Sequence, residues 1–181
     1  MAGILKVDQY QDFNGNTIMT SDGSGNITIN NTALKNTPAF GAKLLLDTPL
    51  TISHQTTTTI LFSEKILDTD NCYSTSTGKF IPTTSGKYFL TTNVKLQSGN
   101  MSNYSFGFID IKKNGTSVAQ GTFDGRNGND SRASAPAISV IQDLNGSSDE
   151  IMVTAYISTV NSAAGTLDVG STFSGYKLIG A

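Results

Sequence analysis

Residues that could perform nucleophilic or acid–base chemistry are sparse in this chain of 181 residues. His54 is its only histidine and Cys72 its only cysteine. A thiol nucleophile needs a base, so we interpret Cys72 as a small buried thiol beside Tyr73 and His54 as a loop or surface residue. General acid–base work by Asp149 and Glu150 would need a cleft and a partner, and we interpret this pair as polar groups at the start of a strand. The sequence therefore predicts a protein that is not an enzyme.

The strongest candidate for metal binding is the segment of residues 124–130. Asp124, Asn127 and Asp130 offer the oxygen ligands that calcium takes, and glycines separate them. Arg126 occupies the third position, so the spacing is not that of a helix–loop–helix site. Because Asn, Asp and Gly are also turn-forming residues, a long hairpin loop is the preferred interpretation. We predict no cofactor, with calcium as the one candidate.

Composition restricts the remaining functions. Charged residues make up 14% of the chain, and the formal net charge is -2 with a pI of about 5.2. No basic surface for nucleic acid is therefore expected. A single cysteine excludes an internal disulfide framework, so the chain can fold in a cytoplasm. We find no segment long enough to span a membrane and no signal-peptide pattern, and expect release by lysis or within a particle.

Hydrophobic alternation predicts an all-β fold. The stretch 77–90 reads as a strand end, a corner containing Pro82 and Gly86, and a second strand. From Lys87 onward, every second residue is apolar or Thr, as in a strand with one buried face. Similar short strands recur to the C-terminus at intervals typical of a sandwich. We expect Tyr88 and Phe173 to be buried.

The first residues form a separate unit. Residues 4–30 read as two or three short strands, with turns at 12–16 and 22–26, and Asn14-Gly15 is a strong hairpin signal. These strands hold too few apolar residues for a core of their own. They must pack on copies of themselves, on the main domain or on a partner. We divide the chain into an N-terminal β arm, residues 1–37, and a head, residues 38–181.

Two strands of the head are apolar on both faces. Alternation places Tyr104, Phe106 and Phe108 on one face of their strand, and Tyr156 opposite the buried face of another. A monomeric sandwich needs one apolar face per sheet. Scattered surface apolar residues are normal, but we favour a subunit interface and name Tyr104, Phe106, Phe108 and Tyr156 as its candidates.

Ordered motifs identify the head. Residues 39–181 resemble the C1q-type globular domain, the jelly roll shared with the tumour necrosis factor superfamily. The resemblance rests on residues 39–44, 58–62, 70–74, 77–82, 86–89 and 171–178. It implies a ten-stranded jelly-roll sandwich and a compact homotrimer with aromatic residues along the three-fold axis. Some members bind calcium near the trimer apex.

The N-terminal segment, residues 3–29, looks like the leading segment of fibre and surface proteins of tailed bacteriophages. This resemblance implies a virion structural protein, assembled in the host cytoplasm, that decorates a capsid or tail. Ile4, Leu5 and Val7 are the anchoring candidates toward capsid or tail proteins, and the head could bind a host glycan or protein. The alternatives are a free-standing carbohydrate- or receptor-binding module of a cell and, third, a glycan depolymerase.

Overall fold

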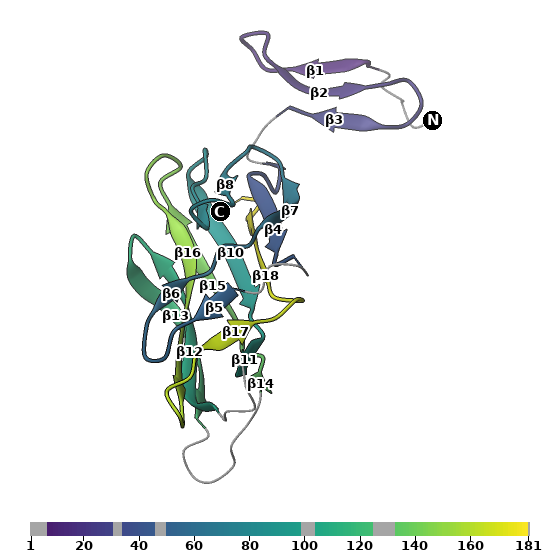
Figure 1. The fold of residues 1–181 in the computed structure, drawn as a ribbon. Coiled ribbons are helices and arrows are strands. Elements are labelled where there is room, and N and C mark those ends of the chain that lie inside the picture. Colours follow the sequence, from purple (N-terminus) through teal and green to yellow (C-terminus); the bar gives the residue numbers. More distant parts are fainter. Residues whose placement is uncertain (1–6, 31–33, 46–49, 99–103, 125–132, 181) are drawn as a thin grey trace.

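A computed structural model describes residues 7–30, 34–45, 50–98, 104–124 and 133–180. These residues form a small N-terminal sheet and a larger β sandwich, joined by one connecting segment (Figure 1). The order of strands along the chain agrees with the predicted all-β class. Pro38 follows a cis peptide bond at the entry to the sandwich.

The N-terminal sheet is an antiparallel meander. Its strands β1 (Gln9–Gln11), β2 (Thr17–Ser21) and β3 (Ile27–Ile29) pair in the order β1-β2-β3 and with no other described strand. A sheet of three short strands with no second layer has little core of its own. The same residues were predicted as short strands from their alternation and their turns.

One layer of the head is a five-stranded sheet in the order β15-β10-β18-β4-β7. All its pairings are antiparallel. The Lys87 strand and the closing strand, which the sequence singled out, are direct neighbours here, with Leu90 opposite Gly175. The strands are β4 (Ala39–Lys43), β7 (Glu64–Asp68), β10 (Gly86–Asn93), β15 (Ala137–Leu144) and β18 (Thr172–Lys177).

The other layer follows the order β13-β12-β16-β9-β8, with β6 also pairing with β16. A smaller sheet, in the order β14-β11-β17-β5, continues the sandwich at one end (Figure 1). The strands of the second layer are β6 (Thr58–Thr59), β8 (Tyr73–Ser74), β9 (Lys79–Phe80), β12 (Tyr104–Lys113), β13 (Thr116–Asp124) and β16 (Ile151–Thr159). Those of the smaller sheet are β5 (Leu50–Ile52), β11 (Leu96–Ser98), β14 (Ala133–Ser134) and β17 (Gly165–Leu167).

The described head thus contains strands β4–β18, several of only two or three residues. The predicted count of ten is therefore not confirmed. The pairing register shifts at bulges within β4, between Gly41 and Ala42, and within β12, between Ile111 and Lys112. The sandwich architecture does not depend on the number of strands.

Apolar side chains from the two layers form one core. Tyr88 and Phe173 are fully buried, as predicted. Phe40 lies at the centre of an aromatic group: its ring centroid is 4.3 Å from that of Phe80 and 4.7 Å from that of Phe173. Aromatic pairs at these separations add to the stabilisation from burial. The core therefore fixes the two layers against each other and leaves their outer faces as candidate sites.

Candidate interaction surfaces

The two residues that could supply a nucleophile and a base have structural roles. Cys72 is buried, and burial together with the neighbouring Asp68 carboxylate raises the pKa of its thiol to about 12. A thiolate is what reacts, so this thiol is poorly suited to act as a nucleophile. His54 uses Nδ1 to accept the backbone N–H of Thr159 at 3.1 Å. Both residues fit the interpretations made from the sequence.

Asp149 and Glu150 bind separate structural partners. Asp149 accepts hydrogen bonds from the Asn114 side chain and the Asn145 backbone and pairs with Lys113 at 3.1 Å. Glu150 pairs with Lys79 at 2.7 Å. Asp149 thus holds the turns at Asn114 and Asn145 against the start of β16, and Glu150 pairs with the neighbouring strand β9, so both carboxylates act as polar groups at a strand start.

Only one of the three calcium-binding candidates lies among the described residues. Asp124 ends β13 and is exposed, whereas Asn127 and Asp130 lie outside the described residues. Among the residues that the structure describes, no group of three or more His, Cys, Asp or Glu side chains could hold a metal ion. The prediction of calcium binding at residues 124–130 therefore stays a prediction.

The carboxyl groups of Asp149 and Asp168 should make the stability of the folded state depend on pH. Hydrogen bonding by Asn114 holds the pKa of Asp149 below 3.8, and the Lys95 ammonium does the same for Asp168. A carboxyl whose pKa is lower in the folded state stabilises the fold above its unfolded pKa and loses that contribution as pH falls through the folded value. We expect the melting temperature to fall between pH 5 and pH 2. Calorimetry at fixed protein concentration would show this, and Asp168→Asn should make the fall less steep.

A bulge in β12 changes which aromatic residues share a face. The register of β12 on β16 shifts between Tyr104 and Phe106. One extra residue reverses the alternation, so Tyr104 points into the core and is 1% exposed, whereas Phe106 and Phe108 lie on the outer face. The expectation that all three point one way is wrong, and Tyr104 is not a surface residue that a neighbouring subunit could contact.

The other three candidates do come together. Phe106, Phe108 and Tyr156 form an aromatic cluster on the outer face of β12 and β16, where Phe108 lies directly opposite Tyr156. The rings of Phe108 and Tyr156 stack with centroids 4.8 Å apart, and Phe106 meets both rings edge-on. The rings shield one another and are only partly exposed. Their role in trimer contacts stays a prediction.

A substitution at Tyr104 tests whether its side chain lies in the core and not in a subunit contact. Its hydroxyl is buried without a hydrogen-bond partner among the described residues, and an unsatisfied buried polar group is destabilising. We expect Tyr104→Phe to raise the free energy of unfolding by about 1 kcal/mol and to leave self-association unchanged. Urea denaturation and sedimentation measure the two quantities. Weaker self-association of a stably folded variant would instead place Tyr104 in a subunit contact.

The five-stranded sheet carries a second apolar surface that the sequence did not reveal. Pairing sets four residues side by side across four strands: Ile141 opposite Phe89, Phe89 opposite Tyr176, and Tyr176 opposite Ala39. Directly opposite residues share one face of a sheet, and here it is the outer face, because Tyr88 and Leu90 beside Phe89 are buried. We call this row and its surroundings the β10 face.

The β10 face has the layout of a protein–protein interface. Ile141 is 54% exposed and Tyr176 is 40% exposed. In the next row Ser139, Thr91, Ser174 and Gly41 leave room for close approach, and Leu67 of β7, 50% exposed and opposite Gly41, ends the row. Ion pairs flank the rows: Lys87 with Asp143 at 2.7 Å and Lys43 with Glu64 at 3.3 Å. An apolar centre within a charged rim is typical of subunit contacts.

The N-terminal sheet is held by two matching turns. Asp12 accepts hydrogen bonds from the backbone of Asn14 and Asn16 and from the Asn16 side chain. Asp22 repeats this arrangement with Ser24 and Asn26, ten residues later. The repeated Asp-x-x-Gly-Asn spacing could have indicated this repeat from the sequence. All of these hydrogen bonds join residues within four positions of one another, so they fix each turn locally.

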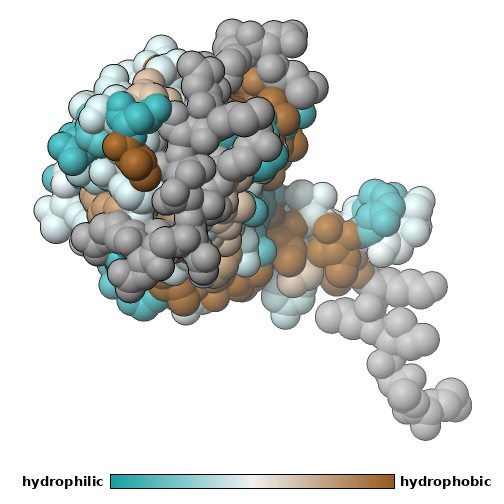
Figure 2. Space-filling model, turned by 60° about the horizontal axis from the view of Figure 1, so that its bottom comes forward, coloured by the Kyte–Doolittle hydropathy of each residue, from teal (hydrophilic) through white to brown (hydrophobic). Residues whose placement is uncertain are grey.

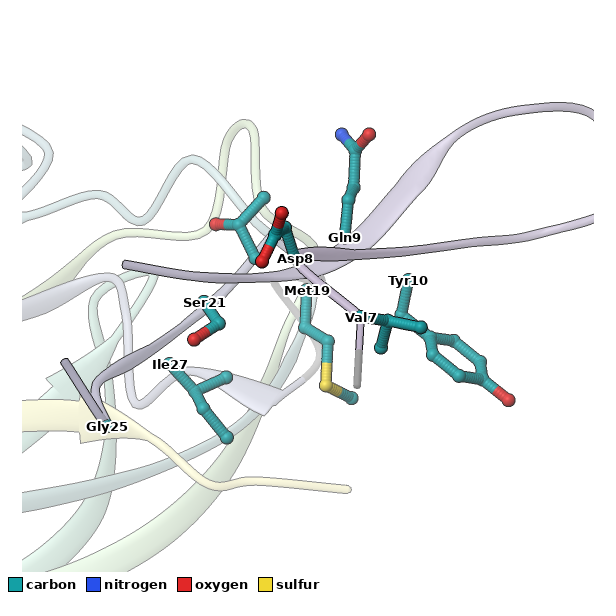
Figure 3. A pocket seen from close by; sticks show the side chains of 9 residues that line it. Val7, Asp8, Gln9, Tyr10, Met19, Ser21, Gly25 and Ile27 are labelled. Atoms are coloured by element: carbon teal, nitrogen blue, oxygen red, sulfur yellow. The ribbon is translucent and has the colours of Figure 1, made fainter. Parts of the chain in front are cut away.

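One side of the N-terminal sheet is apolar. Tyr10 lies opposite Met19, and Met19 opposite Ile29. Figure 3 shows Tyr10, Met19 and Ile27 on the same side of the sheet as Val7, and Gln9 on the other. The apolar side borders a hollow of about 290 Å³. We call Val7, Tyr10, Met19, Ile27 and Ile29 the arm face; Figure 2 shows hydrophobic residues gathered on this projecting part.

The anchoring candidates are mostly outside the described residues. Ile4 and Leu5 lie there, and Val7 is 49% exposed at the margin of the arm face. Sequence reasoning missed Phe13, which stands fully exposed at the tip of the first turn. Phe13 directly follows Asp12 in a predicted turn. This position in the sequence could have indicated an exposed aromatic side chain.

The layered antiparallel sheets define an all-β sandwich. The family described as C1q domain matches residues 39–178, and the chain belongs to this family. Among curated protein sequences no relative matches. Domains with the C1q and tumour necrosis factor fold typically self-associate as trimers and are generally non-enzymatic binding or structural modules.

Solved structures agree on the fold. The globular domain of zebrafish complement 1qA protein is 14% identical, with a TM-score of 0.53, over 78% of this chain and 97% of that one. The tumour necrosis factor Eiger from S. frugiperda is 10% identical, with a TM-score of 0.60, over 79% and 93%. Murine APRIL is 14% identical, with a TM-score of 0.51, over 77% and 98%. In the described part of the chain, no helix is long and apolar enough to cross a membrane.

Proposed function

We propose that this chain is a non-enzymatic homotrimeric surface protein of a bacteriophage particle, a decoration or fibre protein on capsid or tail. The head stabilises the particle or adheres to the host, and the N-terminal arm attaches it. The observation that carries this proposal is the pair of uncovered apolar surfaces, one on the head and one on the arm. Large exposed apolar patches mark sites of protein association.

The β10 face is the surface that favours self-association most. Ile141 and Tyr176 are each more exposed than any member of the aromatic cluster, so a larger fraction of each side chain is open to cover by a partner. Burial is worth about 25 cal/mol per Å² of apolar surface. This assignment differs from the sequence expectation of Phe106, Phe108 and Tyr156, and variants on the two faces distinguish them.

The aromatic cluster supports the second candidate function, a free-standing carbohydrate- or receptor-binding module. If the β10 face is buried in a trimer, Phe106, Phe108 and Tyr156 remain on the opposite layer of each head. Polar Gln120 and Thr122 lie on the adjacent strand β13. Aromatic rings beside polar groups suit a host glycan or a protein epitope. No arrangement among the described residues favours a depolymerase.

Attachment to a particle rests on the N-terminal arm. Its sequence resembles the leading segments of phage fibre and surface proteins, and its turns are rigidly hydrogen-bonded with Phe13 exposed at one tip. An exposed aromatic side chain can act as the anchor in a partner's pocket. Capsid or tail proteins are the proposed partners.

Mass spectrometry of purified particles tests the particle assignment. We expect the chain in particles in a fixed ratio to the capsid protein. The Phe13→Ser variant should be absent from particles but still have the mass of a trimer in solution. Thr28→Ser, on the polar side of the same sheet, is the matched control. A trimer that never accompanies particles would overturn the assignment and favour the free-standing binding module.

A further inference from the structure

The arm face requires a cover, and no second layer of described strands provides one. Tyr10 is 51% exposed and Ile27 is 63% exposed, and both lie on the same side of a single-layered sheet. Three short strands with one open apolar side are not expected to be stable in water. The opposite side carries the polar row of Gln9, Thr20 and Thr28. The sheet is therefore half of a core, and the other half comes from elsewhere.

We propose that the arm faces of three copies pack against one another and form a second core, a short trimeric stalk beneath the heads. This inference rests on the homotrimer of the proposed function. It adds the position of the N-terminal arms within that trimer. The occupant of each arm face is the same face of the other two copies. The polar sides, with Phe13 at the turn tip, then point outward toward the particle.

The point at which the arm joins the head supports this arrangement. Ala39, the first residue of β4, stands in the apolar row of the β10 face directly opposite Tyr176. If that face forms the subunit contact, all three arms start at the contact itself. The segment from Asn30 to Pro38 spans at most roughly 30 Å. Three identical faces are thus held close, at an effective concentration that reaches the millimolar range for short connections.

The chemistry of the arm face suits contact between identical surfaces. Val7, Tyr10, Met19, Ile27 and Ile29 are all uncharged, and Asp8 lies at the margin of the hollow. Identical charged faces would repel one another, whereas identical apolar faces do not. Met19 is on the central strand β2 and has a row neighbour on each side. It is therefore the residue placed nearest to the axis of a three-fold stalk.

Cysteine cross-linking tests the stalk. In a Cys72→Ala background, Met19→Cys is oxidised or treated with a three-armed maleimide, and Thr20→Cys, the adjacent residue on the polar side, is the matched control. We expect linked dimers and trimers from Met19→Cys at more than ten times the yield from Thr20→Cys. Ile27→Cys and Thr28→Cys form a second pair in case Met19→Cys does not fold.

Sedimentation of the same samples separates the two proposals. A trimer in which Met19→Cys and Thr20→Cys react equally, or in which Met19→Cys alkylates freely and does not cross-link, overturns the stalk while the trimeric head stands. A monomer overturns the homotrimer and the stalk with it. Links from Met19→Cys to particle proteins, in place of links between copies of the chain, would assign the arm face to those proteins and also overturn the proposal.

Discussion

Replacing Ile141 with lysine is expected to convert the trimer into folded monomers. Ile141 is 54% exposed in a single chain and lies at one end of the apolar row on the β10 face, so the variant should keep its fold. In the assembled trimer the new ammonium group would be buried without a partner. A buried unpaired charge costs several kcal/mol, and every 1.4 kcal/mol is a factor of ten. We expect dissociation to be favoured at least ~1000-fold.

Two further variants make this result specific. Val160→Lys changes a residue that is 65% exposed after the end of β16, and it should leave the trimer intact. Phe108→Lys tests the aromatic cluster. If Phe108→Lys dissociates the trimer and Ile141→Lys does not, the subunit contact lies on β12 and β16, as the sequence indicated. Circular dichroism establishes that each variant is folded.

Among the described glycines in turns of the head, Gly146→Ala is expected to lower the free energy of unfolding the most. Gly146 has a φ of +72°, and an added Cβ would lie 2.3 Å from the backbone nitrogen of Ser85 and 2.4 Å from the carbonyl carbon of Thr84. Those atoms belong to the corner between Phe80 and β10. Both the left-handed backbone and the collision with main chain oppose the substitution. We expect a loss of about 3 kcal/mol.

Gly170→Ala is the matched control for that loss. Gly170 has a φ of +89°, but an added Cβ would meet nothing within 4 Å. Only the backbone penalty remains, about 1 kcal/mol. Urea denaturation at one protein concentration compares the variants, because the stability of an oligomer depends on concentration. Equal losses would mean that Gly146 does not pack on the corner as described.

Local patterns were enough to predict the core and the class of fold. Alternation placed Tyr88 and Leu90 inside, and both are fully buried. The Pro82–Gly86 corner was predicted from turn residues alone, and it is the place where Gly146 packs. Turn chemistry likewise located both bends of the N-terminal sheet. These features depend on residues close in sequence, which is why the sequence reports them.

The surfaces could not be predicted in the same way. The β10 face joins Ala39, Phe89, Ile141 and Tyr176, which are distant in sequence and become neighbours only through strand order. The phase of β12 changes at a bulge beside Ser105, and no Gly or Pro marks that position. A shift of one residue reverses every side chain before it, so Tyr104 was placed on the wrong face. Pairing partners and bulges are set by the whole sandwich.

Sedimentation equilibrium of the purified chain at micromolar concentration tests the central claim, self-association of a C1q-family head, most directly. The chain has a mass of 19.1 kDa. We predict a single species of three times that mass, persisting on dilution through the micromolar range. A species of 19.1 kDa throughout that range would contradict the account.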